Sequence, residues 1–201
     1  MRVPPPRLTI LILAAGASSR MRGQDKLLQE IDGQPLLARI TGAAQATGLP
    51  VLVVLPPDRP ARLTALIPTG AAHVIASQAA LGLSASLTTG IAALPPDHAV
   101  MLLLADLPEI TTEDLMRIAL AHEEDPHAIL RGAAADSAPG HPVLFPAACR
   151  RELLDLTGDE GARSVLQRHR DRLRLVPLPG NHATTDLDTP EDWAAWRAAR
   201  L

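Results

Sequence analysis

Short apolar runs alternate with longer amphipathic segments through the first 125 residues of the chain. Four runs rich in Val, Ile and Leu, bounded by turn-forming residues, predict buried parallel strands at 8–14, 51–55, 73–76 and 99–105. The segments between them predict helices at 34–47, 60–67, 83–94 and 111–123, the last capped by Thr111 or Thr112. This alternation predicts an α/β fold: a three-layer sandwich with a mostly parallel, Rossmann-like central sheet.

The pattern loosens after Asp125. Shorter signals predict strands near 128–131, 143–145 and 173–177 and helices near 146–154 and 162–168. A last helix is predicted after Pro190, a residue suited to the first helical turn. Since no repeat or low-complexity linker interrupts the chain, we predict a single domain over 1–201, in which 126–201 extends the sheet begun by 8–125.

Composition narrows the classes of partner. The chain has 201 residues, 47% hydrophobic and 20% charged, which is enough to bury one core. A net charge of −3 and a pI near 6.1 give no global attraction to nucleic acid or to an anionic membrane. Two Trp, one Phe and no Tyr leave few rings on which bases could stack. We therefore expect neither nucleic acid nor a membrane as a partner.

The first apolar run also imitates an export signal. Arg2 and Arg7 precede it and small residues follow it, but the run is short, three prolines lie ahead of it, and its removal would delete the first predicted strand. The sequence contains no run of 18 consecutive apolar residues, so no membrane span is predicted. Cys149, the single cysteine, allows no internal disulfide and is expected to be a small buried residue. We therefore expect a cytoplasmic protein.

The turn after the first strand, residues 14–20 (AAGASSR), has the composition of an anion site. In open α/β sheets ligands bind beyond the carboxyl ends of the strands, and small side chains let backbone N–H groups approach a phosphate. Arg20 and Lys26 are placed to neutralise a polyphosphate. The spacing does not fit a Walker A loop, because Gly23 lies seven residues after Gly16 and is followed by Gln24. It does not fit a dinucleotide fingerprint either, because Ser18 and Met21 stand where that motif needs Gly. The alternative is an ordinary turn with solvated cations.

Carboxylates mark two further positions. Asp106 directly ends the strand predicted at 99–105, and one carboxylate facing a polyphosphate is a natural Mg²⁺ ligand. The alternative is a turn Asp before Pro108. Asp186 and Asp188 alternate in the segment 186–192 (DLDTPED), where Asp188 or Thr189 is alternatively a helix cap.

Together these motifs resemble the nucleotidyltransferases related to the molybdenum cofactor enzymes, over residues 8–193. The resemblance is carried by LAAGxSxRM at 13–21, KLL at 26–28, GxPLL at 33–37, GLSxSL at 82–87, ADLP at 105–108, GHP at 140–142, GDxGAR at 158–163 and DLDTPED at 186–192. Ala15, GHP and GDxGAR resemble the cytidylyltransferase branch more than the guanylyltransferase branch, which typically has Leu-Ala-Gly-Gly. The spacer 22–25 departs from the pattern, so Arg22 is assigned no role.

The resemblance implies a nucleotide-diphospho-sugar transferase-like fold and transfer of CMP from CTP to the terminal phosphate of molybdopterin, with Mg²⁺ as cofactor and release of pyrophosphate. Residues 8–125 would form the nucleotide-binding half and 126–201 the acceptor-binding half with the C-terminal helix. Arg20, Lys26 and Asp106 are the predicted catalytic residues. Asp106, Asp188 and, less well placed, Asp186 are the predicted metal ligands. The predicted nucleotide-binding residues are Leu13, Ala14, Ala15, Gly16, Ala17, Ser18, Ser19, Arg20, Lys26, Gln78, Gly82, Ser84 and Ser86.

The predicted acceptor-binding residues are His141, Pro142, Asp159, Gly161 and Arg163. His141 would donate to a pterin or its phosphate, unless it is a packed loop residue. Arg163 would pair with the acceptor phosphate, unless it forms an ion pair with Asp159 or Glu160. The run 168–170 (RHR) is interpreted as a solvated helix end.

Other functions fit the same motifs. The chain could transfer a nucleotide to a sugar phosphate or alditol phosphate, because fold-level likeness does not fix the acceptor. It could also be a carrier that binds the finished cofactor and passes it to a recipient molybdoenzyme, or a regulatory nucleotide-binding module. A measurement of turnover separates the two transferase hypotheses, which differ in their acceptor, from the carrier and the regulatory module, which release no pyrophosphate.

Overall fold

The structure, a computed structural model, describes residues 7–159 and 161–200. Two residues named above lie outside the described ranges. These are Arg2, which flanks the signal-like segment, and Glu160, one of the two alternative partners of Arg163.

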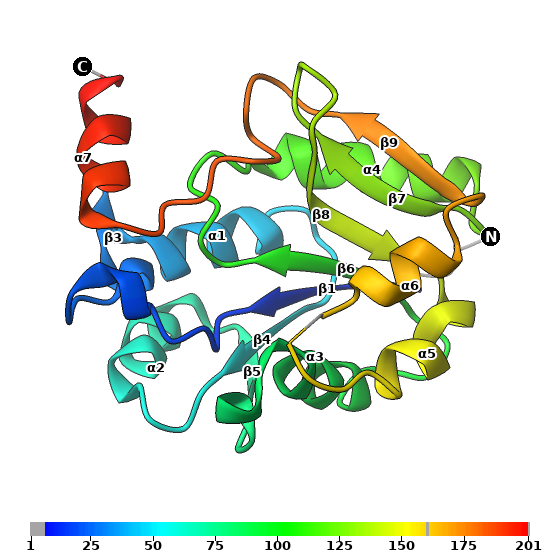
Figure 1. Cartoon of the computed structure of the whole chain (residues 1–201), viewed down its shortest axis with the longest axis horizontal. Coiled ribbons are helices and arrows are strands. Elements are labelled where there is room, and N and C mark those ends of the chain that lie inside the picture. Colours follow the sequence, from blue (N-terminus) through cyan, green and yellow to red (C-terminus); the bar gives the residue numbers. More distant parts are fainter. Residues whose placement is uncertain (1–6, 160, 201) are drawn as a thin grey trace.

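A seven-stranded sheet runs through the molecule (Figure 1). Its order is β5 (Ala72–Ile75), β4 (Val51–Leu55), β1 (Leu8–Leu13), β6 (Ala99–Leu104), β8 (Pro139–Phe145), β7 (Ile129–Ala133) and β9 (Leu173–Pro177). β5, β4, β1 and β6 pair in parallel, as do β7 and β9, whereas β8 is antiparallel to both of its neighbours. The predicted α/β fold with a mostly parallel sheet is therefore confirmed.

Helices cover both faces of this sheet. One face carries α1 (Leu36–Gln45), α2 (Pro60–Leu66) and α4 (Thr112–Glu124), and the other carries α3 (Leu83–Ala92), α5 (Arg150–Leu154) and α6 (Arg163–Arg168). Successive side chains of a strand point to opposite faces, so Ile10 and Ile12 join the first core and Leu11 and Leu13 the second. Burial on both faces explains why β1 is continuously apolar and resembles an export signal.

The C-terminal helix α7 (Pro190–Ala198) lies at the end of the molecule toward which β1 and β6 run (Figure 1). Thr189 caps this helix, Asp192 completes the capping box, and Pro190 occupies the first turn. The cap is thus Thr189, which leaves the carboxylate of Asp188 available for other contacts. None of the described helices is long and apolar enough to cross a membrane.

Three local predictions need correction. The helix predicted at 34–47 begins only at Leu36, because Gln34–Pro35 forms β3 and pairs with β2 (Glu30–Ile31) around a turn in which Asp32 and Gly33 have φ of 54° and 76°. β5 is an edge strand and is largely exposed rather than buried. β8 is antiparallel and begins at Pro139, so the GHP motif lies on a strand rather than in a loop.

Candidate active site

The strand order reverses between β1 and β6. β4 lies beyond β1 and β8 beyond β6, so the chain segments leaving β1 and β6 diverge at a topological switch point, where α/β proteins bind ligands. Leu13 and Leu104 are paired at the ends of these strands. The loop that follows β1 therefore faces Asp106, which follows β6.

The loop after β1 presents backbone N–H groups that have no hydrogen-bond partner among the described residues. The amides of residues 15 to 18 donate no hydrogen bond to any residue that the structure describes. Ala15, Gly16 and Ala17 line a cavity of about 640 Å³. A group of unpaired amides beside a cavity can bind the oxygens of a phosphate chain. Other predicted residues on the cavity wall are Leu13, Lys26, Gly82, Ser86 and Asp106.

Lys26, the only lysine in the sequence, bridges the two principal carboxylates of the site. Its Nζ donates to Asp188 Oδ1 at 2.7 Å and also to Asp106 Oδ2. Burial alone would lower the pKa of Lys26, but Asp106 and Asp188 hold it above its ordinary value. Arg20 Nη2 lies 2.6 Å from Asp188 Oδ2. The structure thus brings together Arg20, Lys26, Asp106 and Asp188.

The carboxylates fit a divalent cation. Asp106 Oδ1 is buried and has no hydrogen-bond partner among the described residues, so one oxygen of this carboxylate has no internal role. The pKa of Asp186 is raised by partial burial and then by the charges of Asp188 and Asp106. The three carboxylates are therefore close enough to repel one another. No trio of His, Cys, Asp or Glu within 7–159 and 161–200 is arranged to hold a metal. Two carboxylates completed by phosphate and water are the ligand set that Mg²⁺ prefers.

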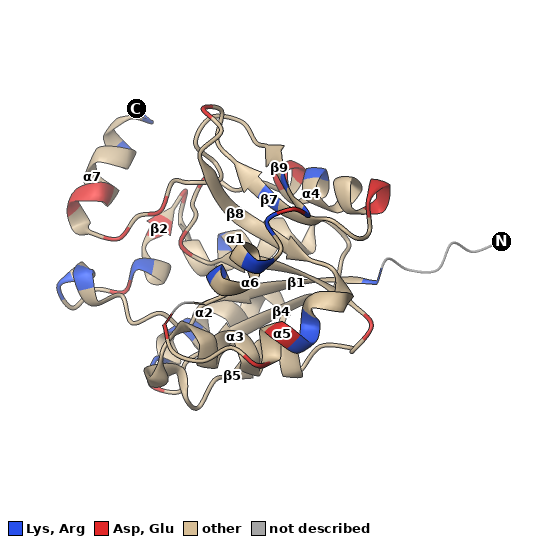
Figure 2. Ribbon diagram, turned by 45° about the vertical axis from the view of Figure 1, so that its right-hand side comes forward, with Lys and Arg blue, Asp and Glu red and all other residues tan. Residues whose placement is uncertain are grey.

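Two contacts border the segment that brings Asp188 to this site from far along the chain. His141 N donates to Ala183 O at 2.8 Å, and a Cβ on Gly140 would lie 1.8 Å from the same oxygen, so only glycine allows this crossing. On the other side Arg22 Nη2 pairs with Glu191 Oε1 at 2.7 Å. Figure 2 shows the acidic start of α7 at the same end of the molecule as β2.

A second cavity of about 440 Å³ adjoins the first, and the two share Leu13, Leu83 and Leu104. Of the predicted acceptor residues, His141, Gly161 and Arg163 line it. Arg131 also lines it and was not predicted, because it ends the strand predicted at 128–131 and belongs to no motif. Its guanidinium donates to Gly140 O (Nε, 2.9 Å) and Pro139 O (Nη2, 3.2 Å). The second cavity is therefore lined mainly by apolar side chains, with His141 and two arginines as its polar side chains.

Several predicted residues make contacts within the protein instead of lining a cavity. Ser84 is buried and its hydroxyl donates to Thr157 O at 3.2 Å, while Gln78 is exposed at the start of a short 3₁₀ turn. Asp159 packs on Gly82, where a Cβ would lie 2.0 Å from its Oδ1. The described residues include no Arg163–Asp159 ion pair. Ala14 and Pro142 are buried, Ser19 is exposed, and Cys149 is buried as expected.

His141 should make the protein less stable in acid. Burial, aided by the charge of Arg131, lowers the pKa of His141 from 6.5 to about 4. Between these values the unfolded chain binds a proton that the folded chain does not, so stability falls as the pH drops from 6.5 toward 4, by up to about 3 kcal/mol at about 1.36 kcal/mol per pKa unit. Urea unfolding at pH 7 and pH 4.5 measures this loss.

The variant His141→Gln isolates the effect, because every other titrating group is retained. We expect its stability to fall less than that of the wild type across the same pH window. Equal losses in the two proteins would show that another group dominates. At neutral pH the imidazole is uncharged, so His141 can offer a phosphate a hydrogen bond but no charge.

Comparisons with known proteins identify the family of the chain. Residues 10–173 match the family of MobA-like NTP transferase domains. The chain belongs to this family. The predicted nucleotidyltransferase activity is thereby supported at the level of the family, and this MobA-like protein is a nucleotidyltransferase whose donor base the family does not specify.

Individual relatives extend the likeness to most of the chain. A probable molybdenum cofactor guanylyltransferase of Nostoc sp. (strain PCC 7120) is 30% identical over 192 residues, which cover 93% of this chain and 89% of the relative. The crystal structure of Rv0371c from Mycobacterium tuberculosis H37Rv is 26% identical, with a TM-score of 0.82 and coverage of 95% and 97%. Another structure of Rv0371c, 24% identical with a TM-score of 0.75 over 94% and 96% of the chains, is a complex with manganese.

Proposed function

We propose that this MobA-like transferase moves CMP from CTP to the terminal phosphate of molybdopterin, with Mg²⁺ and release of pyrophosphate. The observation that carries the proposal is the unpaired amides of residues 15–18 beside the cluster of Lys26, Asp106 and Asp188. Phosphoryl transfer needs positioning and charge neutralisation more than a protein nucleophile, and this arrangement offers both. The manganese complex of Rv0371c adds support for a divalent cation.

The loop and the cations would bind the donor. The amides of residues 15–18 would hold the β- and γ-phosphates, and Arg20 and Lys26 would stabilise the negative charge that builds up on the leaving pyrophosphate. Lys26 then exchanges its carboxylate partners for phosphate oxygens. Asp106 and Asp188 would hold Mg²⁺, with Asp186 nearby, and the bound metal would neutralise phosphate charge.

The acceptor would enter the second cavity. Arg163 and Arg131 supply positive charge for its phosphate, and His141, Gly161 and the apolar wall bound its ring system. Because the two cavities share Leu13, Leu83 and Leu104, a donor in one and an acceptor in the other meet at this wall. A phosphate monoester is already an anionic nucleophile, so no general base is required. Pro142 and Asp159 would shape the wall through the segments on which they lie.

The preference for CTP rests on the sequence: Ala15 in place of a second glycine, the GHP motif and the GDxGAR motif. The segment 78–86 would bind the cytosine and ribose, and it contains the predicted residues Gln78, Gly82, Ser84 and Ser86. Gly82 and Ser86 line the first cavity. The Nostoc relative carries the name of a guanylyltransferase, so the donor base is the part of the proposal that most needs a test.

A pyrophosphate-release screen tests the proposal. We expect the purified protein with Mg²⁺ and molybdopterin to release pyrophosphate from CTP with a kcat/KM at least about tenfold above that for GTP, ATP or UTP, a difference of ~1.4 kcal/mol. The expected reason is hydrogen bonding to the cytosine edge by the 78–86 segment.

Each other outcome has a distinct meaning. Preference for GTP would overturn the donor assignment and leave nucleotidyl transfer intact. Turnover with sugar or alditol phosphates but not with molybdopterin would overturn the acceptor assignment. Stoichiometric binding of CTP without pyrophosphate release with any acceptor would contradict the enzyme and favour a carrier or a regulatory module.

A further inference from the structure

We propose that Arg62, on α2, is a positioning residue that holds the nucleotide loop in its binding conformation, assisted by Arg59. The inference rests on the proposed role of this loop in binding the donor phosphates. It concerns residues outside the motifs of the sequence, because Arg62 and Arg59 lie in or beside the predicted helix 60–67 and Asp25 lies in the spacer 22–25, which departs from the family pattern.

Arg62 is fully buried, which is unusual for an arginine. Its Nη1 donates to Ala14 O at 2.6 Å. Its Nε and Nη2 donate to the two oxygens of Asp25, at 2.7 and 2.9 Å, and Nη2 also donates to Ser18 Oγ at 3.0 Å. Three nitrogens of one guanidinium thus hold the beginning, the middle and the end of the segment 14–25. A rigid planar fork of this kind defines geometry as well as charge.

These contacts determine which way the loop amides point. Arg62 binds the carbonyl of Ala14, and Arg59 Nη2 donates to the carbonyl of Ala17 at 2.8 Å. In a planar trans peptide the C=O and the following N–H point in opposite directions. The N–H groups of Ala15 and Ser18 are therefore turned away from the guanidinium groups. They are two of the amides that have no partner in the described protein.

Asp25 connects the same network to Lys26. Burial alone would raise the pKa of Asp25, but its hydrogen bonds with Arg62 hold it below the ordinary value, so it remains a carboxylate. Asp25 Oδ1 also accepts from Leu27 N at 3.0 Å, which caps the short helix that begins at Lys26. Ser18 has a left-handed φ of 52°, and its hydroxyl bonds to Arg62 and Asp25. The pair of Arg62 and Asp25 therefore determines both the orientation of the loop amides and the position of the backbone that carries Lys26.

The loop needs such support because its own side chains are too small to fix it. Between Ala14 and Ser19 there are only Ala, Gly and Ser side chains, and a Cβ added at Gly16 would meet no heavy atom within 4 Å. Amides that are already oriented bind an anion without a reorganisation cost. Losing the guanidinium should therefore weaken donor binding even when the fold survives.

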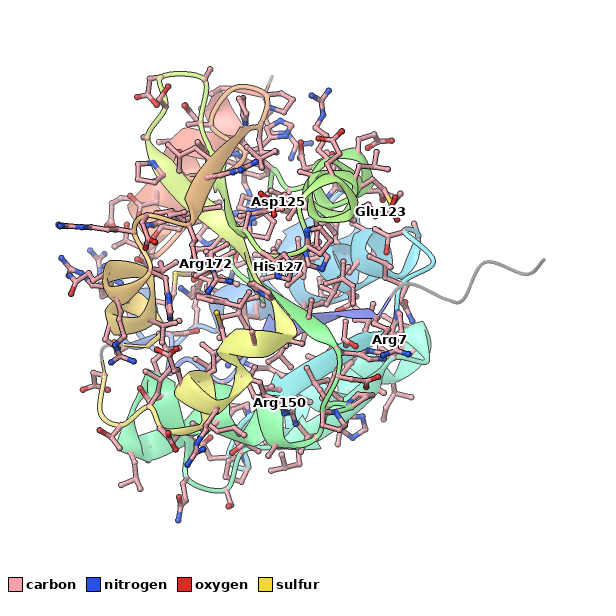
Figure 3. The ribbon with its side chains drawn as sticks, turned by 90° about the vertical axis from the view of Figure 1, so that its right-hand side faces the viewer. Arg7, Glu123, Asp125, His127, Arg150 and Arg172 are labelled. Atoms are coloured by element: carbon pink, nitrogen blue, oxygen red, sulfur yellow. The ribbon has the colours of Figure 1, made fainter. Side chains whose placement is uncertain are left out.

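The experiment compares Arg62→Lys with Arg62→Met in the full chain, and Arg150→Met serves as the matched control. Lysine keeps the charge opposite Asp25, so this variant is expected to fold, but one ammonium cannot bind Ala14, Ser18 and Asp25 together. Arg150 also donates to two backbone carbonyls, those of Leu94 (2.9 Å) and Pro95 (3.3 Å). It lies at the end of the molecule shown in Figure 3, away from α7.

We expect Arg62→Lys to raise the KM for the nucleoside triphosphate by about 10²-fold, because a small misplacement of binding groups has effects of this size. The KM for the acceptor should stay unchanged. Hydrogen exchange of the amides of Lys26 and Leu27, which donate to Ser18 Oγ and Asp25 Oδ1, should become faster than in the wild type. Arg62→Met should show the same effects, and Arg150→Met should lower Tm without either change.

Two outcomes overturn the inference: an unchanged nucleotide KM in a folded Arg62→Lys variant that turns over, or unchanged exchange of the amides of Lys26 and Leu27. If Arg62→Met fails to fold, the nucleotide KM and the amide exchange of Arg62→Lys alone test the inference. A wild-type protein that releases no pyrophosphate from any nucleotide contradicts the proposed function instead. In that event faster exchange of the amides of Lys26 and Leu27 in Arg62→Lys still supports the positioning role of Arg62.

Discussion

Asp106→Asn is expected to abolish turnover, lowering kcat by about 10³-fold or more, because metal-assisted neutralisation of phosphate charge contributes several kcal/mol to the transition state. Asparagine has the same size as aspartate, so the packing after β6 is preserved. It removes the charge from the carboxylate whose Oδ1 is buried without a partner in the described structure and whose Oδ2 binds Lys26. Pyrophosphate release measures turnover, Tm measures whether the fold is preserved, and electron paramagnetic resonance measures Mn²⁺ binding.

A matched control is Asp97→Asn. Asp97 Oδ2 pairs with Arg7 Nη1 at 3.1 Å, and Arg7 lies at the end of the molecule shown in Figure 3. The side chain of Asp97 is exposed, so the substitution Asp97→Asn should leave kcat and Mn²⁺ binding unaffected. An Asp106→Asn variant with wild-type turnover would contradict the metal role, whatever its Tm.

The central strands could be predicted from the sequence because their environment is uniform. β1, β4 and β6 begin and end within one residue of the predicted limits, since strands buried on both faces are continuously apolar and are bounded by turn residues. The start of α4 was also predictable, because the capping box of Thr111 and Asp114 is a local signal.

Other features depend on neighbours that are distant in the sequence. The apolar letters of β5 do not reveal that it forms the edge of the sheet, and the direction of β8 is not encoded in its own pattern. The β2–β3 hairpin is too short to give a periodic signal, although Asp32-Gly33 is a turn pair that could have indicated it.

The site divides in the same way. Arg20, Lys26, Asp106 and Asp188 are carried by motifs, and the structure brings them together. Arg62 and Arg131 carry no motif, because an arginine on a helix or strand resembles a solvated cation until its burial is known. The same applies to the bridge formed by Lys26: the sequence predicts a cation near carboxylates but not that one ammonium binds two of them. Long-range pairing of this kind becomes visible only in the folded chain.

Lys26→Met is expected to have opposite effects on turnover and on metal binding. Turnover should fall by about 10²- to 10³-fold, because a cation that stabilises the leaving pyrophosphate is lost. Mn²⁺ binding in the absence of nucleotide should become tighter by about tenfold, since one nearby unit charge is worth ~1 kcal/mol or more at such a site. The physical reason is that in the free protein the ammonium of Lys26 lies between Asp106 and Asp188 and offsets part of their negative charge. Without it the two carboxylates repel each other, and a divalent cation relieves the repulsion.

Titration of Mn²⁺ against the nucleotide-free protein measures this effect, and Lys26→Arg is its matched control. Arginine keeps the positive charge, so metal affinity should stay close to that of the wild type even though turnover falls, because a guanidinium cannot occupy the position of a compact ammonium. Equal Mn²⁺ affinity in Lys26→Met and the wild type would show that the ammonium does not compete with the metal. If the affinity rises only in Lys26→Met, Lys26 holds the place of the cation until the triphosphate draws it away. The free protein would then avoid binding metal firmly before its donor arrives.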